Sequence, residues 1–219
     1  MIRRLGALAT VVAAVLAMSA MVASAASADV LTAESVPTTI TGNGDSSTHT
    51  MGFDIGQFKC SGASYHGAVS ASPSSQVTLT PVYTSCTLAG LAPVISLNGC
   101  DYLLHINAAS TEGTTDITCS AGQEITLSAP AVALRKCIIH IPPQTGLGPI
   151  TVSNIGTGTT REITLNMNIS GLKYSQTTGT SEVGNCATAD GTTNGTYTGK
   201  AVLTGEKSST GVHIGIFAS

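Results

Sequence analysis

The stretch EITLNMNI, residues 162–169, decides the fold class. Polar and apolar residues alternate strictly along it, and the apolar set is Ile163, Leu165, Met167 and Ile169. A period of two places the two sets on opposite faces of a β-strand, one facing a core and the other facing solvent. The stretch therefore predicts a strand in an antiparallel sheet that is wet on one side.

Similar β-like runs, separated by clusters of turn residues, recur about every 8–15 residues from Met51 onward. The last two runs flank a polar turn and predict a C-terminal hairpin, and residues 117–119 and 124–128 predict a short strand pair. Pro81 cannot donate to a ladder, so its run ends there or lies at an edge. The pattern predicts an all-β fold, an antiparallel β-sandwich or jelly roll. The other runs are residues 76–83, 101–107, 137–141, 197–204 and 212–217.

The N-terminus has the pattern of a secretory signal. Arg3 and Arg4 precede an apolar stretch that ends in two small-residue sites, with cleavage expected after Ala25 or Ala28. No basic cluster follows, so no membrane span is expected after cleavage. The expected organisation is a helical signal peptide at 1–28, a polar N-terminal segment or edge strand at 29–50, and a single β-sandwich domain at 51–219. The mature protein is then secreted, either extracellular or at the cell surface.

All six cysteines lie downstream of this signal. An even set in an oxidising space predicts three disulfides, although six cysteines allow fifteen pairings. Links between neighbouring β-like runs favour Cys60–Cys86, Cys100–Cys119 and Cys137–Cys186. No CxxC motif occurs, and the spacings match no zinc pattern, so neither a metal nor a cofactor is expected.

Charge and motifs exclude several function classes. After removal of the signal, seven basic and twelve acidic residues remain, a net charge of −5. Nucleic acids and anionic lipids need clustered Lys and Arg, so neither is an expected partner. The chain has no GxSxG elbow, and no two carboxylates stand out as a glycosidase pair, so no catalytic residue is assigned.

Two pairs of residues are the first candidates for ligand binding. His105 and His140 lie in the two most apolar runs and would share a face if those runs were neighbouring strands. With no carboxylate or third ligand nearby in sequence, two outward or core imidazoles are favoured over a two-histidine metal site. The chain has no Trp for a sugar platform, which leaves Tyr102 and Tyr174 as the aromatic candidates.

Four motifs stand out along the mature chain: FKC at 58–60, PVYTSC at 81–86, NGCDY at 98–102 and CIIHIP at 137–142. With these motifs the chain resembles a group of uncharacterised, secreted, six-cysteine β-rich proteins of soil actinobacteria. The resemblance covers most of the mature chain and implies export and a shared cysteine architecture, but it brings no catalytic residue.

The expected function is that of a secreted, non-enzymatic protein with a binding or structural role outside the cell or at its surface. Two alternatives stay open. An exported hydrolase with a site on loops predicts a deep pocket in which His lies within hydrogen-bond reach of a carboxylate and a Ser. A carbohydrate-binding module predicts an exposed Tyr pair on one concave face, with a cell-wall or extracellular glycan as its partner.

Overall fold

The computed structural model describes residues 31–45, 49–106, 112–128, 137–178 and 192–218. The expected signal peptide and Cys186 lie outside these ranges. The described residues form strands and one short 3-10 helix, η1 (Gly158–Thr160), with no α-helix among them, so the all-β prediction is confirmed. The strands are β1 (Leu31–Ala33), β2 (Thr38–Gly44), β3 (His49–Phe53), β4 (Gly56–Val69), β5 (Gln76–Leu88), β6 (Val94–Ser96), β7 (Cys100–Ile106), β8 (Glu112–Cys119), β9 (Ile125–Ser128), β10 (Cys137–Ile141), β11 (Gln144–Ile155), β12 (Glu162–Thr178), β13 (Thr192–Lys207), β14 (Val212–Ile214) and β15 (Ile216–Ala218).

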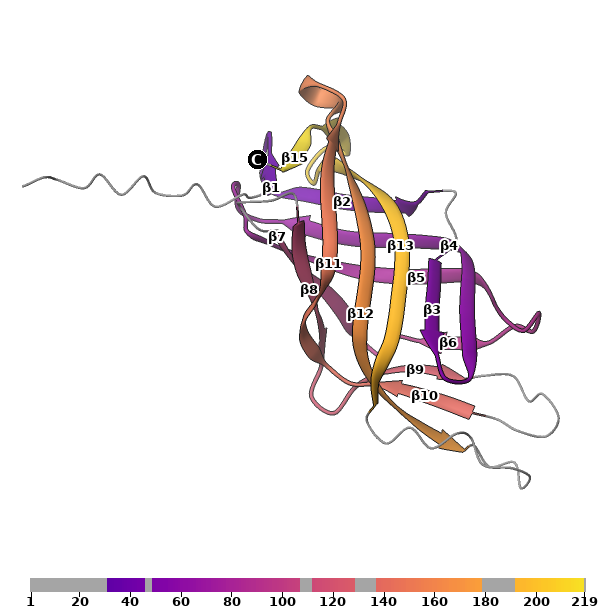
Figure 1. Ribbon diagram of the computed structural model, residues 1–219. Coiled ribbons are helices and arrows are strands. Elements are labelled where there is room, and N and C mark those ends of the chain that lie inside the picture. The colour runs from indigo at the N-terminus through magenta and orange to yellow at the C-terminus, as the bar shows by residue number, and fades with distance from the viewer. Residues whose placement is uncertain (1–30, 46–48, 107–111, 129–136, 179–191, 219) are drawn as a thin grey trace, which may run out of the picture.

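Eight of these strands close into a barrel. Their order is β13-β2-β4-β5-β7-β8-β11-β12, and β12 pairs with β13 to complete the circle. Figure 1 shows β2, β4, β5 and β7 crossing behind β8, β11, β12 and β13. The expected β-sandwich or jelly roll is therefore corrected to a closed antiparallel barrel. Alternation along a strand separates an inward from an outward face, but it does not tell which strand pairs with which.

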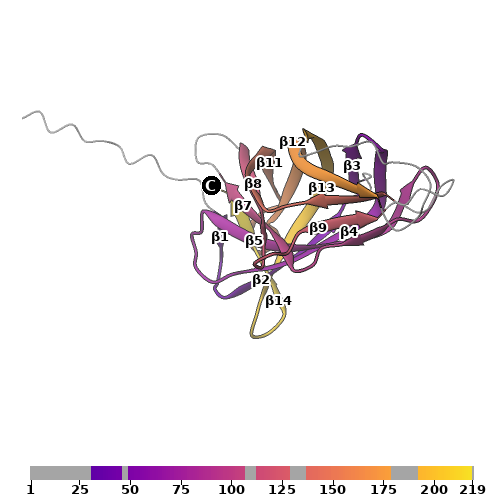
Figure 2. The ribbon, with the colours of Figure 1, turned by 90° about the horizontal axis from the view of Figure 1, so that it is seen from below.

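A small sheet closes one end of the barrel. The end of β12, residues 175–178, pairs with β10, which pairs with β9 and then β6. Ile95, Ile125 and Ile141 of this end sheet face the barrel interior. Figure 2 looks from this side and shows β9 in front of the barrel strands. The strand pair expected at 117–119 and 124–128 does not form, because β8 stays in the barrel while β9 joins the end sheet.

The N-terminal segment is part of the barrel. Within the segment expected as a tether or edge strand, β2 instead lies between β13 and β4 and pairs with both. The predicted C-terminal hairpin forms from β13 and β14. β5 continues through Pro81, which pairs with Tyr65 on β4, whereas the ladder from β5 to β7 ends at the Leu79–Tyr102 pair. The missing N–H of Pro81 thus costs no hydrogen bond in the ladder between β5 and β7.

Inward side chains of the barrel form one core. The stretch that predicted the fold lies in β12, and its four alternating apolar residues, Ile163, Leu165, Met167 and Ile169, are all buried. Two disulfides join directly opposite residues of neighbouring barrel strands, Cys60–Cys86 on β4 and β5 and Cys100–Cys119 on β7 and β8. Both were predicted. The third pair, Cys137–Cys186, stays a prediction because Cys186 lies outside the described residues.

Candidate functional site

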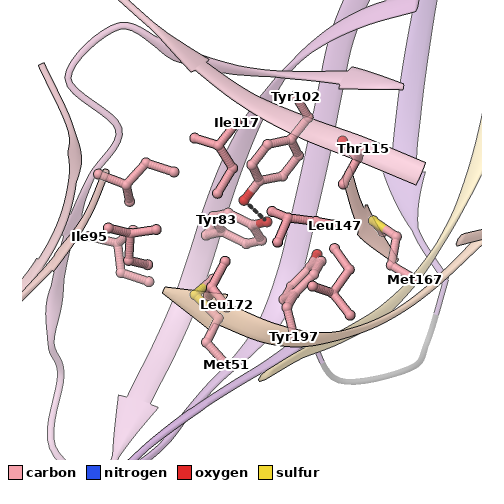
Figure 3. A pocket seen from close by; sticks show the side chains of 13 residues that line it. Met51, Tyr83, Ile95, Tyr102, Thr115, Ile117, Leu147, Met167, Leu172 and Tyr197 are labelled. Atoms are coloured by element: carbon pink, nitrogen blue, oxygen red, sulfur yellow. Dashed lines mark hydrogen bonds between the residues drawn. The ribbon is translucent and has the colours of Figure 1, made fainter. Parts of the chain in front are cut away.

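The barrel and its end sheet enclose a cavity of about 30 Å³. A cavity of this size has room for one or two water-sized molecules. Nearly all of its wall is hydrocarbon, so it is suited to a small apolar molecule more than to water. Figure 3 shows the lining side chains, which are Met51, Tyr83, Ile95, Tyr102, Thr115, Ile117, Ile125, Ile141, Leu147, Met167, Ile169, Leu172 and Tyr197.

Two tyrosines of the cavity wall are turned toward each other. The hydroxyl oxygens of Tyr83 on β5 and Tyr102 on β7 lie 2.9 Å apart, as the dashed line in Figure 3 marks. Burial raises the pKa of both phenols above the ordinary value, so both stay neutral. Because each hydroxyl has a partner, the cavity beside them presents little polar surface.

A second polar cluster lies beside the cavity. Nδ1 of His49 lies 2.8 Å from the hydroxyl of Tyr197, which lies 2.8 Å from the hydroxyl of Tyr65. Burial lowers the pKa of His49, with the backbone of Lys200 acting in the opposite direction, and burial raises the pKa of Tyr65 to about 12. The cluster is therefore neutral, as the low polarity of its surroundings requires. Sequence patterns do not reveal it, because its members are scattered singly along the chain.

Two glycines make the space for the imidazole of His49. A methyl carbon on Gly199 would lie 2.3 Å from Nδ1 of His49, and one on Gly44 would lie 2.5 Å from Nε2. These distances are too short for any side chain, so glycine is needed at both positions while the ring stays in place. Nε2 itself is buried and makes no hydrogen bond to the described residues.

An open groove of about 660 Å³ runs outside the barrel wall, over β8, β11 and β12. Ile117 and Leu147 line both this groove and the inner cavity, so these two side chains separate the cavity from solvent. The β8–β11 ladder is interrupted on both sides of Leu147. The side chain of Gln144 bridges β11 and β12 here, donating to the carbonyl of Lys173 at 3.0 Å and accepting from its N–H at 2.9 Å.

The structure places the predicted tyrosine candidates inside the molecule. Tyr102 lines the cavity, and Tyr174 is only 1% exposed, with its ring against Phe53. The hydroxyl of Tyr174 accepts a hydrogen bond from the N–H of Asp54 at 3.2 Å. Tyr174 is buried and Tyr102 is half-buried, so these two rings do not form an exposed pair, and their proposed role in ligand binding stays a prediction.

The two predicted histidines do not meet, because β7 and β10 are not neighbours. Each instead pairs with a carboxylate. Nε2 of His105 lies 2.8 Å from Asp116, and Nδ1 of His140 lies 2.5 Å from Glu124. Desolvation acts to raise the pKa of Asp116, but hydrogen bonds from the Gly146 N–H and from His105 hold it below its usual value. Within the described ranges, no three metal-ligating side chains gather at one place.

The chain matches no protein-family model, no curated protein and no solved structure in comparisons with each. In the part of the chain that the structure describes, no helix is long and apolar enough to cross a membrane. The interpretation of function consequently rests on the barrel itself and on the side chains described above.

Proposed function

We propose that this protein is exported and acts outside the cell or at its surface as a binding protein, with a small apolar molecule as the ligand of its barrel. The observation that carries the proposal is the hydrocarbon-walled cavity between the barrel and its end sheet. The signal-like N-terminus and the two disulfides support the proposed compartment, because disulfides persist in oxidising spaces.

Eight-stranded barrels are either filled by side chains or hold one small ligand. This barrel is close to the first case, so its ligand is limited to a few heavy atoms unless the lining moves. Met51 and Met167 supply that freedom, because methionine has three rotatable bonds and a polarisable sulfur. The pocket thus fits small hydrocarbons, with entry past Ile117 and Leu147 from the outer groove.

The test uses the only two methionines of the mature chain. Met1, Met18 and Met21 leave with the signal, whereas Met51 and Met167 both line the cavity. In protein labelled with ¹³C at the methionine methyl groups, two NMR signals report directly on the cavity. Titration with xenon is expected to shift both signals in a saturable way, and benzene, which is larger than the resting cavity, is expected to do so as the methionine side chains move aside. Unshifted signals at saturating benzene and xenon would contradict the proposal.

Variants of Leu147 provide matched controls. Leu147→Ala enlarges the cavity, and is expected to tighten benzene binding at a cost of about 2–5 kcal/mol in stability. Leu147→Phe fills the cavity and is expected to abolish the shifts. Ile163→Val, a small change at a core residue that does not line the cavity, should leave binding unaltered.

A further inference from the structure

Three side chains form a connected row on the outer face of the end sheet. Glu124 directly precedes β9, His140 is on β10, and Thr177 is on the part of β12 that pairs with β10. Nδ1 of His140 lies 2.5 Å from Oε1 of Glu124, and Nε2 lies 2.7 Å from Oγ1 of Thr177. One imidazole therefore connects a carboxylate with a hydroxyl.

The chemistry of the three groups sets the direction of the hydrogen bonds. An ionised carboxylate only accepts, so the proton of the neutral imidazole is on Nδ1, facing Glu124. Nε2 then carries a lone pair, and the hydroxyl of Thr177 donates to it. A hydroxyl, an imidazole and an orienting carboxylate in this relation are the parts of an activated nucleophile, recognised by geometry and not by sequence order.

The backbone holds this row in place while leaving it accessible. His140 lies opposite Thr126 of β9 on one side and Ser175 of β12 on the other, so its strand is paired on both edges. The side chains of His140 and Glu124 are 22% and 38% exposed, and Thr177 is exposed. A small molecule in solution can therefore reach the hydroxyl of Thr177.

His105 offers a comparison within the same protein. Its Nε2 faces Asp116 at 2.8 Å, but its Nδ1 lies 3.3 Å from the amide nitrogen of Gln76. An amide N–H is a donor and not a nucleophile, so this pair lacks the reactive group. Of the two histidines, His140 thus faces a hydroxyl with its second ring nitrogen, whereas His105 faces an amide.

We propose that Thr177 accepts acyl groups from small activated carboxylic esters, with His140 as general base and Glu124 as a positioning residue. Oγ1 of Thr177 attacks the ester carbonyl carbon while its proton passes to Nε2 of His140. The bond to the leaving alcohol then breaks, and His140 returns the proton to the alcohol. Water hydrolyses the acyl-threonine by the same route, releasing the carboxylic acid. This activity is separate from the barrel cavity and departs from the expectation of a non-enzymatic protein.

The experiment follows acetylation and turnover of the mature chain with p-nitrophenyl acetate. Thr177→Val keeps the shape of the side chain but removes the hydroxyl, and His140→Gln removes the base. Each is expected to lower the rate at least about 100-fold, the lower end of what general-base catalysis contributes. Thr177→Ser should retain activity. His105→Gln is the matched control and should leave the rate unaltered.

Peptide mass spectrometry after acid quenching locates the acetyl group, which is expected on the peptide that contains Thr177. Glu124→Gln keeps an acceptor for Nδ1 but removes the charge, so it should slow acetylation without lowering the melting temperature. An acetyl group found only on lysines or on His140, or a Thr177→Val variant as fast as the unaltered protein, would overturn the proposal. Cavity binding measured on the same variants should be unchanged, so the two proposals fail independently.

Discussion

His49 and Tyr197 are 148 residues apart in the chain, yet Nδ1 of the imidazole lies 2.8 Å from the phenol hydroxyl inside the barrel. His49 begins β3, Tyr197 is on β13, and these two strands are paired. The contact is completely buried on the histidine side, so it depends on a neutral imidazole. The free energy of unfolding therefore depends on whether His49 is protonated.

This link predicts a specific pH dependence for the His49→Gln variant. Folding lowers the pKa of His49, so below the ordinary histidine pKa of 6.5 the unfolded chain binds a proton that the folded protein resists. The His49 contribution to the free energy of unfolding is thus complete above pH 6.5 and is lost as the pH falls toward the folded pKa. Urea unfolding between pH 8 and pH 5 should show the stability advantage of the unaltered protein over the variant shrinking with acid. An advantage that stays constant with pH would contradict this.

Gly199→Ala is expected to destabilise the protein by about 1–3 kcal/mol, as overpacking does in a filled core. The added carbon would lie 2.3 Å from Nδ1 of His49, and the ring is held by its hydrogen bond. A double-mutant cycle with His49→Ala tests the cause, because removing the ring should relieve most of the clash. Additive losses in the cycle would show that the clash is with another group.

The hydroxyl pair inside the cavity predicts a non-additive effect. Tyr102→Phe removes the partner that lies 2.9 Å from the hydroxyl of Tyr83, which is expected to cost about 1 kcal/mol for one half-buried hydrogen bond. Replacing both tyrosines by phenylalanine removes both polar groups and should cost less than the single change. Chemical denaturation of Tyr83→Phe, Tyr102→Phe and the double variant measures the effect, and a double variant that is less stable than both single variants would argue against it.

The two described disulfides predict losses of similar size. Cys60–Cys86 closes a segment with a sequence separation of 26, and Cys100–Cys119 one of 19. In the chain-entropy model each stabilises by about 3 kcal/mol, with only a weak dependence on length. Paired Cys→Ala variants, measured in urea, should lose about this much each. A negligible loss would mean that the unfolded chain is already restricted in these segments without the disulfide, which would contradict the chain-entropy model here.

Local sequence predicted the individual strands well and their partners poorly. The alternation at 162–169 correctly gave a strand with one buried face, and the two hairpin disulfides followed from cysteines at the ends of consecutive β-like runs. The pair of strands expected at 117–128 was wrong, because a turn signal does not tell whether the chain reverses or crosses to another sheet. Tyr102 was selected as a ring for sugar binding and His140 as half of a histidine pair. The structure instead places Tyr102 in the cavity wall and His140 next to Thr177.

By itself the sequence determined the all-β class, the inward and outward faces of its strands, and the pairing of cysteines that are close along the chain. All of these follow from short-range periodicity and loop closure. Only the tertiary structure decided that β12 pairs with β13 to close the barrel, that His49 meets Tyr197, and that Thr177 meets His140. The physical reason is that such contacts depend on the register between distant strands, and no residue pattern within a single strand encodes that register.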